Sequence, residues 1–337
     1  MKKDVTRIFV NSIVRKTLKE IEDSPERNIR NLIDMGLDLS NGRFQRYFMK
    51  SAQKMMQNQS SAYYALVKET AAHVNHDTLA SFGINLGYNS CTSGAKIIRE
   101  IEAKECFNIP WQLTLYADSK NCTYYKNIIK QAKELGIYTY LLFIKGNPNK
   151  FVSLIKQHSD CAFILFLEPN QINQDFFKAF GDVHNVMTAV RFDKSYPFAV
   201  EVCAELRMRK FLYSVYTYYD DTNQNHITSG KTMEDASAIY PVFVFLFASE
   251  TCTPKTKESV RKYTIETRDG QRYPSFIVDA ESDNDMIDSV ISDDSCMIAF
   301  NEDGYLCSDT PEYQKHEYNI FKTDLKDILK KAVPKKK

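Results

Sequence analysis

The sequence predicts an α/β protein built as a partial barrel of six strand-helix units, with a helical region before it and a small α+β segment after it. From Phe82 onward, short runs rich in β-branched and aromatic residues alternate with amphipathic patterns, as parallel strands do when helical crossovers join them. This alternation is absent before residue 80 and stops after about residue 250. We therefore expect three domains, at residues 1–80, 81–250 and 251–337.

Helices alone are expected in the first domain, where apolar residues recur with a helical period and Ser24-Pro25-Glu26 is typical of a helix start. The strands expected in the barrel are Phe82–Gly87, Gln112–Tyr116, Tyr138–Phe143, Ala162–Leu167, Val186–Phe192 and Phe211–Tyr219. The helices expected between them are Gly94–Lys104, Tyr124–Leu135, Asn149–Gln157, Gln171–Phe180 and Tyr196–Met208.

An apolar helix at Met233–Phe247 is expected to close the barrel. Beyond residue 253 the pattern favours two antiparallel hairpins, because β-rich runs flank Asp269-Gly270 and Asp303-Gly304, and such dipeptides are typical of tight turns. The first hairpin would pair Ser259–Thr267 with Tyr273–Asp279. A Lys-rich helix is expected from Asp324 onward.

Composition excludes several classes of protein. The 337 residues include 43% hydrophobic and 26% charged residues, an ordinary globular mixture, and the formal net charge of +1 gives no field that would attract nucleic acid. No apolar stretch is long enough for a membrane span. We expect a cytoplasmic protein that binds neither nucleic acid nor a membrane, with its eight cysteines, none in a CxxC pair, mostly reduced.

Polar residues follow the predicted strands at the barrel mouth, where the loops of a parallel barrel converge. They are expected to bind a small molecule or a peptide, or to act as ordinary loop residues. Asp118, Glu168, Asp193 and Asp220 could hold a divalent ion, although no metal is predicted. The full set of predicted ligand-binding residues is Asn89, Cys91, Asp118, Ser119, Lys145, Glu168, Arg191, Asp193 and Asp220.

Other sequence patterns are weaker evidence for a functional site. His73 and His76, three residues apart on a helix, could bind zinc, but no further His and no catalytic Glu lie near them, so a surface pair is favoured. Cys91 lacks an identifiable base. The sequence contains no GxSxG, GxGxxG or Walker-type loop, which argues against the enzyme classes that these motifs mark.

The stretch from Leu113 to Asn147 resembles the second strand, helix and third strand of the radical S-adenosylmethionine enzymes. Ala132-Lys-Glu-Leu-Gly-Ile137 is similar to the family's helix end, and Lys145-Gly-Asn147 echoes its third strand end. The segment from Cys296 to Cys307 resembles the hairpin of the auxiliary domain, of the SPASM or twitch type, in many such enzymes. The resemblance spans residues 82–310 and implies a six-stranded partial barrel.

The sequence departs from this family where the family keeps its chemistry. The family implies three thiolates, spaced CxxxCxxC, after the first strand, and Cys91 stands there alone, while an iron-sulfur cluster needs three or four. Tyr116-Ala-Asp-Ser119 replaces the Gly-Gly-Glu loop that holds the cofactor's amino group. We expect no cluster, and S-adenosylmethionine stays open as a ligand.

The resulting hypothesis is a degenerate family member without a cluster, which binds a small molecule or peptide at the barrel mouth or holds a partner protein through its helical N-terminal region. Whether it is an enzyme stays open. One alternative is an enzyme of another class, in which Asp118, Lys145, Glu168 or Asp193 performs acid-base or metal-assisted chemistry. The other is an iron-sulfur protein whose ligands come from distant cysteines.

Overall fold

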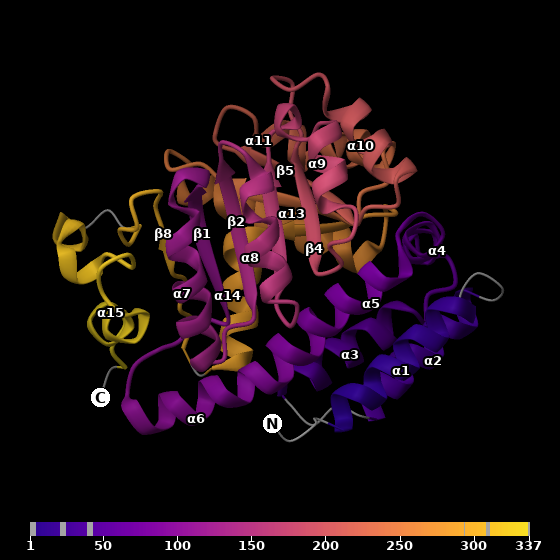
Figure 1. Ribbon diagram of the computed structural model, residues 1–337. Coiled ribbons are helices and arrows are strands. Elements are labelled where there is room, and N and C mark those ends of the chain that lie inside the picture. The colour runs from indigo at the N-terminus through magenta and orange to yellow at the C-terminus, as the bar shows by residue number, and fades with distance from the viewer. Residues whose placement is uncertain (1–4, 21–24, 39–42, 293, 308–310, 336–337) are drawn as a thin grey trace. The chain divides into compact units, whose positions relative to one another are not determined.

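The computed structural model describes residues 5–20, 25–38, 43–292, 294–307 and 311–335 (Figure 1). The chain divides into two compact units. Unit 1 contains most of the N-terminal helices together with Met187–Asn284, and unit 2 contains Ser81–Val186 and Asp285–Lys337. The predicted boundaries at residues 80 and 250 stay a prediction. None of the described helices is long and apolar enough to cross a membrane.

The N-terminal region is helical, as its periodicity predicts. Its helices are α1 (Val5–Glu20), α2 (Pro25–Asp38), α3 (Arg43–Met55), α4 (Tyr63–His73) and α5 (His76–Ile84). Met56, Tyr63, Tyr64 and Ala71 form a buried cluster on which Ile33 of α2 and Met55 of α3 pack. These apolar contacts hold helices that would be marginal in isolation.

The strands of unit 1 are parallel and lie in the order β7-β6-β5-β4. They are β4 (Val186–Arg191), β5 (Tyr213–Tyr219), β6 (Phe243–Ala248) and β7 (Phe276–Asp279). The helices that follow or join them are α10 (Ala199–Met208), α11 (Gln224–Thr228), α12 (Lys231–Ser237), α13 (Pro254–Gly270) and α14 (Ala280–Ile291). The sequence locates β4 and β5 to within two residues.

Two predictions in this unit are wrong. The apolar run predicted as one helix at Met233–Phe247 contains the end of α12 and the parallel strand β6, separated by Tyr240 in a left-handed conformation and by Pro241. The first predicted hairpin does not exist, because Ser259–Thr267 lies within helix α13 and β7 pairs in parallel with β6. Thr253 caps α13 with its side chain and Pro254 occupies the first turn, so a helix begins five residues before the expected strand and runs through it.

The strands of unit 2 are also parallel, in the order β3-β2-β1-β8. They are β1 (Gln112–Asp118), β2 (Thr139–Lys145), β3 (Ala162–Leu167) and β8 (Ala299–Phe300). The α-helices are α6 (Ala95–Glu105), α7 (Cys122–Glu134), α8 (Val152–Gln157), α9 (Gln174–Phe180) and α15 (Leu325–Ala332). Short 3-10 turns lie at Ser119–Asn121, Pro148–Phe151, Pro169–Gln171, Pro311–Gln314 and His316–Tyr318.

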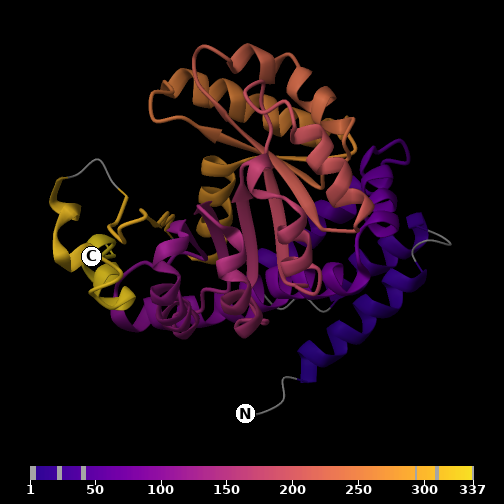
Figure 2. The ribbon, with the colours of Figure 1, turned by 45° about the horizontal axis from the view of Figure 1, so that its top comes forward.

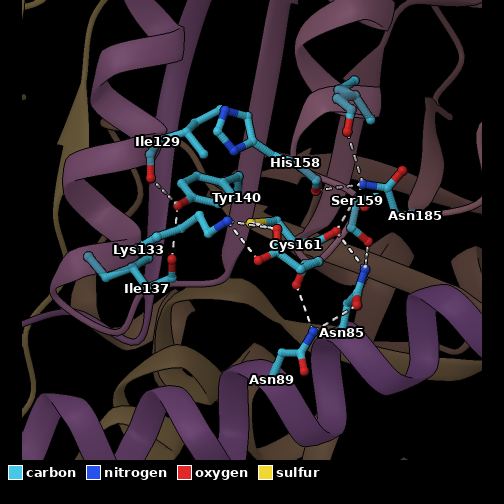
Figure 3. A network of polar contacts seen from close by, with 12 residues as sticks. Asn85, Asn89, Ile129, Lys133, Ile137, Tyr140, His158, Ser159, Cys161 and Asn185 are labelled. Atoms are coloured by element: carbon cyan, nitrogen blue, oxygen red, sulfur yellow. Dashed lines mark hydrogen bonds and ion pairs between the residues drawn. The ribbon is translucent and has the colours of Figure 1, made fainter. Parts of the chain in front are cut away.

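The core of unit 2 lies between its strands and α7. Tyr140 is fully buried and its hydroxyl donates to the carbonyl oxygens of Ile137, at 2.9 Å, and Ile129, at 3.3 Å (Figure 3). Gly136 ends the turn after α7 with φ of +94°, a conformation that favours glycine. The C-terminal helix α15, yellow in Figure 2, packs on α7, and the Leu325 amide donates to Gln131 at 2.7 Å.

The first predicted strand, Phe82–Gly87, is wrong. Its residues continue α5 into a π-helix at Asn85–Gly94, so β1 is the first strand among the described residues. The second predicted hairpin is partly right: Phe300 and Leu306 form an antiparallel bridge across the Asp303-Gly304 turn, but β8 pairs in parallel with β1. The element order is that of an α/β fold.

Candidate functional site

The polar residues that end β1, β2 and β3 lie along one edge of unit 2, as predicted. Asp118 and Lys145 are register partners on neighbouring strands, and Glu168 directly follows β3. Parallel strands bring their carboxyl ends to the same edge of a sheet, which explains this convergence.

Hydrogen bonds within the loops occupy several of these polar groups. Asp118 accepts from the Lys120 amide at 2.9 Å, and the Ser119 hydroxyl accepts from the Asn147 amide at 3.3 Å. Glu168 and Gln171 form a capping box. Gln171 also donates to the carbonyl oxygens of Ile144 and Gly146, each at 2.8 Å, which ties neighbouring turns together. The structure therefore gives these side chains a role in holding the loops, while ligand binding by them stays a prediction.

An aromatic ladder lies on the face of unit 2 that these polar residues share. Tyr116 stacks on Phe143 with ring centroids 5.0 Å apart, and Phe143 stacks on Phe166 at 4.3 Å. The three rings come from β1, β2 and β3 at matched register. Tyr116 is 37% exposed while Phe166 is buried, so the ladder presents one open end to solvent.

A second aromatic group surrounds Arg191 in unit 1. The guanidinium carbon of Arg191 lies 4.3 Å from the ring centroid of Tyr218 and 5.6 Å from those of Tyr196 and Tyr216. Its Nε donates to Asp193 at 2.5 Å. Arg191 ends β4 and Tyr216 is its register partner on β5, so the strands themselves position the cation against the rings.

The neighbouring strand β6 extends this group. Phe243, Phe245 and Phe247 alternate with buried Val244 and Leu246, and all three phenylalanines are partly exposed. Register pairs Phe245 with Tyr216 and Phe247 with Tyr218, and the Tyr218 and Phe247 centroids are 5.7 Å apart. Successive residues of a strand point to opposite faces, so these side chains share one face. We call this the aromatic face; its members are Arg191, Tyr216, Tyr218, Phe243, Phe245 and Phe247.

Sequence reasoning found Arg191 and Asp193 but missed the rings around them. Burial raises the pKa of Tyr218, and Arg191 opposes that rise. The signal was present as aromatic residues at every second position, in Tyr216 and Tyr218 and again in Phe243, Phe245 and Phe247. The wrong helix assignment at Met233–Phe247 concealed half of it.

The Asp220 side chain stabilises the turn that follows β5. Its carboxylate accepts from the Thr222 hydroxyl at 2.6 Å and from the Thr222 amide at 2.8 Å, and these hydrogen bonds lower its pKa. The adjacent Asp221 accepts from the Thr253 amide and hydroxyl at 3.1 and 2.9 Å. Both carboxylates shape the loops after β5 and β6.

Asn89 and Cys91 do not lie at the carboxyl ends of strands, which corrects their predicted position. Both are buried in the π-helix. The Asn89 amide donates to Asn85 at 2.9 Å and to the Asp160 carbonyl at 2.8 Å, just before β3 begins (Figure 3). Glu168 follows the other end of β3, about 20 Å away for a strand of this length. Burial raises the pKa of Cys91 to about 12, so the thiolate is disfavoured.

Asn89 belongs to a buried amide network at the amino end of β3. Asn85 donates to the carbonyls of Ser159 and Cys161, both at 2.9 Å, and Asn185 donates to Cys161 at 3.0 Å and to His158 at 3.1 Å (Figure 3). Lys133 pairs with Asp160 at 2.6 Å beside it. The network satisfies carbonyl groups that would otherwise be buried without partners.

The residues do not fit the cluster of the resembled family. With β1 as the first strand, the loop that follows it carries Cys122 alone, and its thiol donates to the Lys150 carbonyl at 3.1 Å. Among the described residues, no three His, Cys, Asp or Glu side chains gather so that they could hold a metal ion. The zinc alternative at His73 and His76 finds no support, because His73 pairs with Glu69 at 3.0 Å and His76 contacts the Ala71 carbonyl at 3.0 Å.

No protein-family model and no curated protein matches the chain. Solved structures of SuiB from Streptococcus suis match the chain in fold. SuiB bound to precursor peptide SuiA shares 10% identity at a TM-score of 0.52, over 69% of this chain and 67% of that chain. Another SuiB structure shares 9% identity at a TM-score of 0.51, over 86% and 77%. SuiB bound to S-adenosylmethionine gives 10% identity and a TM-score of 0.52. At these identities the likeness shows the fold alone, which this chain shares with SuiB.

Proposed function

We propose that this chain is a peptide-binding protein that uses a radical S-adenosylmethionine-like fold without its iron-sulfur cluster. The aromatic face is the observation that carries the proposal. Partly exposed rings stand in a row along β6, from Phe243 at its start to Phe247 near its carboxyl end, where the register partner Tyr218 lies under the Arg191 guanidinium. Rings exposed at such a position are typical of binding sites, since rigid aromatic groups give large contact area at low entropic cost.

The spacing of the rings favours an extended peptide. Phe243, Phe245 and Phe247 repeat every second residue of a strand, about 7 Å apart. The side chains on one face of an extended peptide repeat at the same distance, so a peptide that lies along β6 would meet a ring with every second side chain. A compact ligand would contact only two neighbouring rings and would not match the whole row. SuiB, which shares the fold, has been crystallised bound to precursor peptide SuiA.

Arg191 supplies the polar contact that would orient the peptide. The guanidinium carries five N–H donors in a fixed plane, and its Nε donor is used by Asp193. Stacking on Tyr218 fixes that plane. A peptide carbonyl or carboxylate would accept from the guanidinium at a site where aromatic rings strengthen charge interactions by excluding water.

The experiment is a selection of displayed peptides on the immobilised full chain, followed by affinity measurement for the selected sequence by fluorescence anisotropy. We expect selected peptides to carry apolar residues at alternate positions. Phe247→Ala should weaken binding about tenfold, because interface aromatic residues often contribute more than 1 kcal/mol. Arg191→Lys, which keeps the charge and loses the planar stack, should weaken it less.

Phe198→Ala is the matched control. Phe198 is 70% exposed at the start of α10 and is not part of the aromatic face, so the change should leave the affinity unaltered. Equal affinity of the wild type and the Phe247→Ala variant would contradict the proposed site. Failure to select any peptide would contradict peptide binding itself.

The cluster part of the proposal has its own test. After anaerobic incubation with iron and sulfide, the desalted chain should retain no stoichiometric iron. With S-adenosylmethionine and dithionite it should form no 5′-deoxyadenosine. Either product would show that cysteines such as Cys122 assemble a cluster, and would favour the iron-sulfur alternative.

A further inference from the structure

Helix α3 carries a line of cations on one side. Between Arg43 and Met55 it contains four basic residues and no acidic one. At 100° per residue, the basic residues and one tyrosine fall within an arc of about 100°. We call this the cationic stripe; its members are Arg43, Arg46, Tyr47, Lys50 and Lys54.

The stripe is exposed, while other sides of α3 are packed. All five of its members are exposed, Tyr47 by 53%, and the neighbouring Phe48 by 52%. Elsewhere on the helix, Met49 lies so close to Gly36 of α2 that a Cβ added to that glycine would meet its sulfur at 2.8 Å. Gln53 donates to Asp34 of α2 at 2.7 Å, and Met55 packs on the buried cluster around Tyr64.

Charge is unevenly divided along the chain. Residues 1–58 contain twelve Lys and Arg against seven Asp and Glu, which leaves 32 against 36 for the remainder. Among the described residues, Arg46, Lys50 and Lys54 form no ion pair with a carboxylate. At these three positions α3 therefore carries positive charge that no described carboxylate pairs with, although the chain as a whole is nearly neutral.

We infer that the cationic stripe docks an acidic segment of a partner polypeptide. Charge complementarity calls for an anionic partner, and the shape of the stripe favours a narrow one. The acid-free zone is one helix wide, because α2 exposes Asp34 and Asp38 and α1 exposes Glu20. A flat anionic membrane would meet those carboxylates too. Nucleic acid is disfavoured by a pI of about 7.5.

The aromatic residues of α3 agree with a protein partner. Tyr47 lies within the stripe and Phe48 is exposed beside it, and arginine, tyrosine and phenylalanine are enriched in protein interfaces. The partner segment would carry Asp or Glu at helical or extended spacing, with an apolar side chain for the rings. This inference goes beyond the proposed peptide site and does not rest on it, since it uses different residues.

The probe is a fluorescein-labelled peptide of Glu and Ala with a single Phe, measured by anisotropy against the full chain at low and physiological salt. The wild type should bind it about tenfold more tightly than the same peptide with Gln in place of Glu, with an affinity that falls as salt rises. Arg46→Glu/Lys50→Glu/Lys54→Glu should lose at least about tenfold in affinity. The neutral variant Arg46→Gln/Lys50→Gln/Lys54→Gln should lose less.

The matched control reverses three exposed cations of α13, as Lys255→Glu/Arg261→Glu/Lys262→Glu, and changes the net charge equally. It should bind the peptide as the wild type does. An equal loss of affinity in this control would show that net charge alone explains the binding, and would overturn the inference. So would unchanged binding by both stripe variants, or tighter stripe-dependent binding to phosphatidylserine vesicles or to single-stranded RNA than to the peptide. Circular dichroism of each variant separates loss of binding from loss of fold.

Discussion

The two edges of the parallel strands in unit 2 are built for different tasks. At the amino edge, Asn85, Asn89 and Asn185 are buried and their amides are satisfied by carbonyl groups. At the carboxyl edge, Lys145 is 68% exposed in its side chain and pairs with Glu302 at 3.6 Å. Buried, fully paired polar groups are costly to disturb, whereas exposed pairs contribute little. The amino edge therefore carries stability and leaves the carboxyl edge free to vary.

The amino edge also holds a buried acid, which predicts the largest effect. Asp288 accepts from the amides of Trp111, just before β1, and Cys296, and burial raises its pKa to about 7. Because the folded state keeps the proton that the unfolded state loses near pH 4, stability should fall by about 3 kcal/mol as pH rises from about 4 to 7. Urea unfolding across this range measures the slope.

Asp288→Asn should flatten that slope, since the carboxamide does not titrate. A residual slope is expected from Glu102 and Asp279, because burial raises the pKa of both carboxyl groups, that of Asp279 to about 6. If the variant shows the slope of the wild type, Asp288 does not titrate as its burial implies.

Asn185→Ala tests the amide network. The side chain donates to three carbonyls, at 3.0 Å to Cys161, 3.1 Å to His158 and 3.3 Å to Ile155, so its removal should cost about 2 kcal/mol of unfolding free energy. Asn225→Ala, at an exposed position, should cost less than about 0.5 kcal/mol in the same urea titration. An equal loss of unfolding free energy in the two variants would show that the network does not stabilise the fold.

Tyr116→Ala tests the open end of the aromatic ladder. The ring is 37% exposed and stacks on Phe143 on one side, so its loss should cost about 1 kcal/mol. Tyr116→Phe keeps the stack and should retain nearly all of the stability. A loss larger than that of Asn185→Ala would mean that the carboxyl edge is as important to folding as the amino edge.

Lys145→Ala should have the smallest effect. Its ion pair with Glu302 is exposed on both sides, and such pairs contribute less than about 0.5 kcal/mol. The thermal midpoint should not move measurably. A clear destabilisation would place this lysine in the folding core of the carboxyl edge and remove the contrast between the two edges.

The fold could be predicted where the chain follows simple periodicity. Five strands of the alternating region, β1 to β5, agree closely with their predicted positions, because a short apolar run bounded by polar loops fits a buried strand better than a helix there. Prediction failed where one pattern fits two structures. Phe82, Ile84 and Leu86 alternate as in a strand, yet buried Asn85 and Asn89 follow a helical spacing, and sequence alone does not reveal that asparagine will be buried.

The candidate site could be predicted only in part. The rule that loops converge at the carboxyl ends of strands located Asp118, Lys145 and Arg191 correctly. It could not show that Asp118 and Asp220 would be used by their own turns, because those bonds depend on loop geometry. The rings around Arg191 were hidden by an apolar run that suits a helix as well as the strand β6.

The central claim is that a peptide lies along β5 and β6 on the aromatic face. The most direct test is photo-crosslinking of a selected peptide that carries one benzophenone side chain, with the labelled residues of the full chain identified by mass spectrometry. The account predicts crosslinks to Tyr218 and the phenylalanines of β6, which are partly exposed. Crosslinks confined to the π-helix at Asn85–Gly94, or spread without preference over the surface, would contradict it.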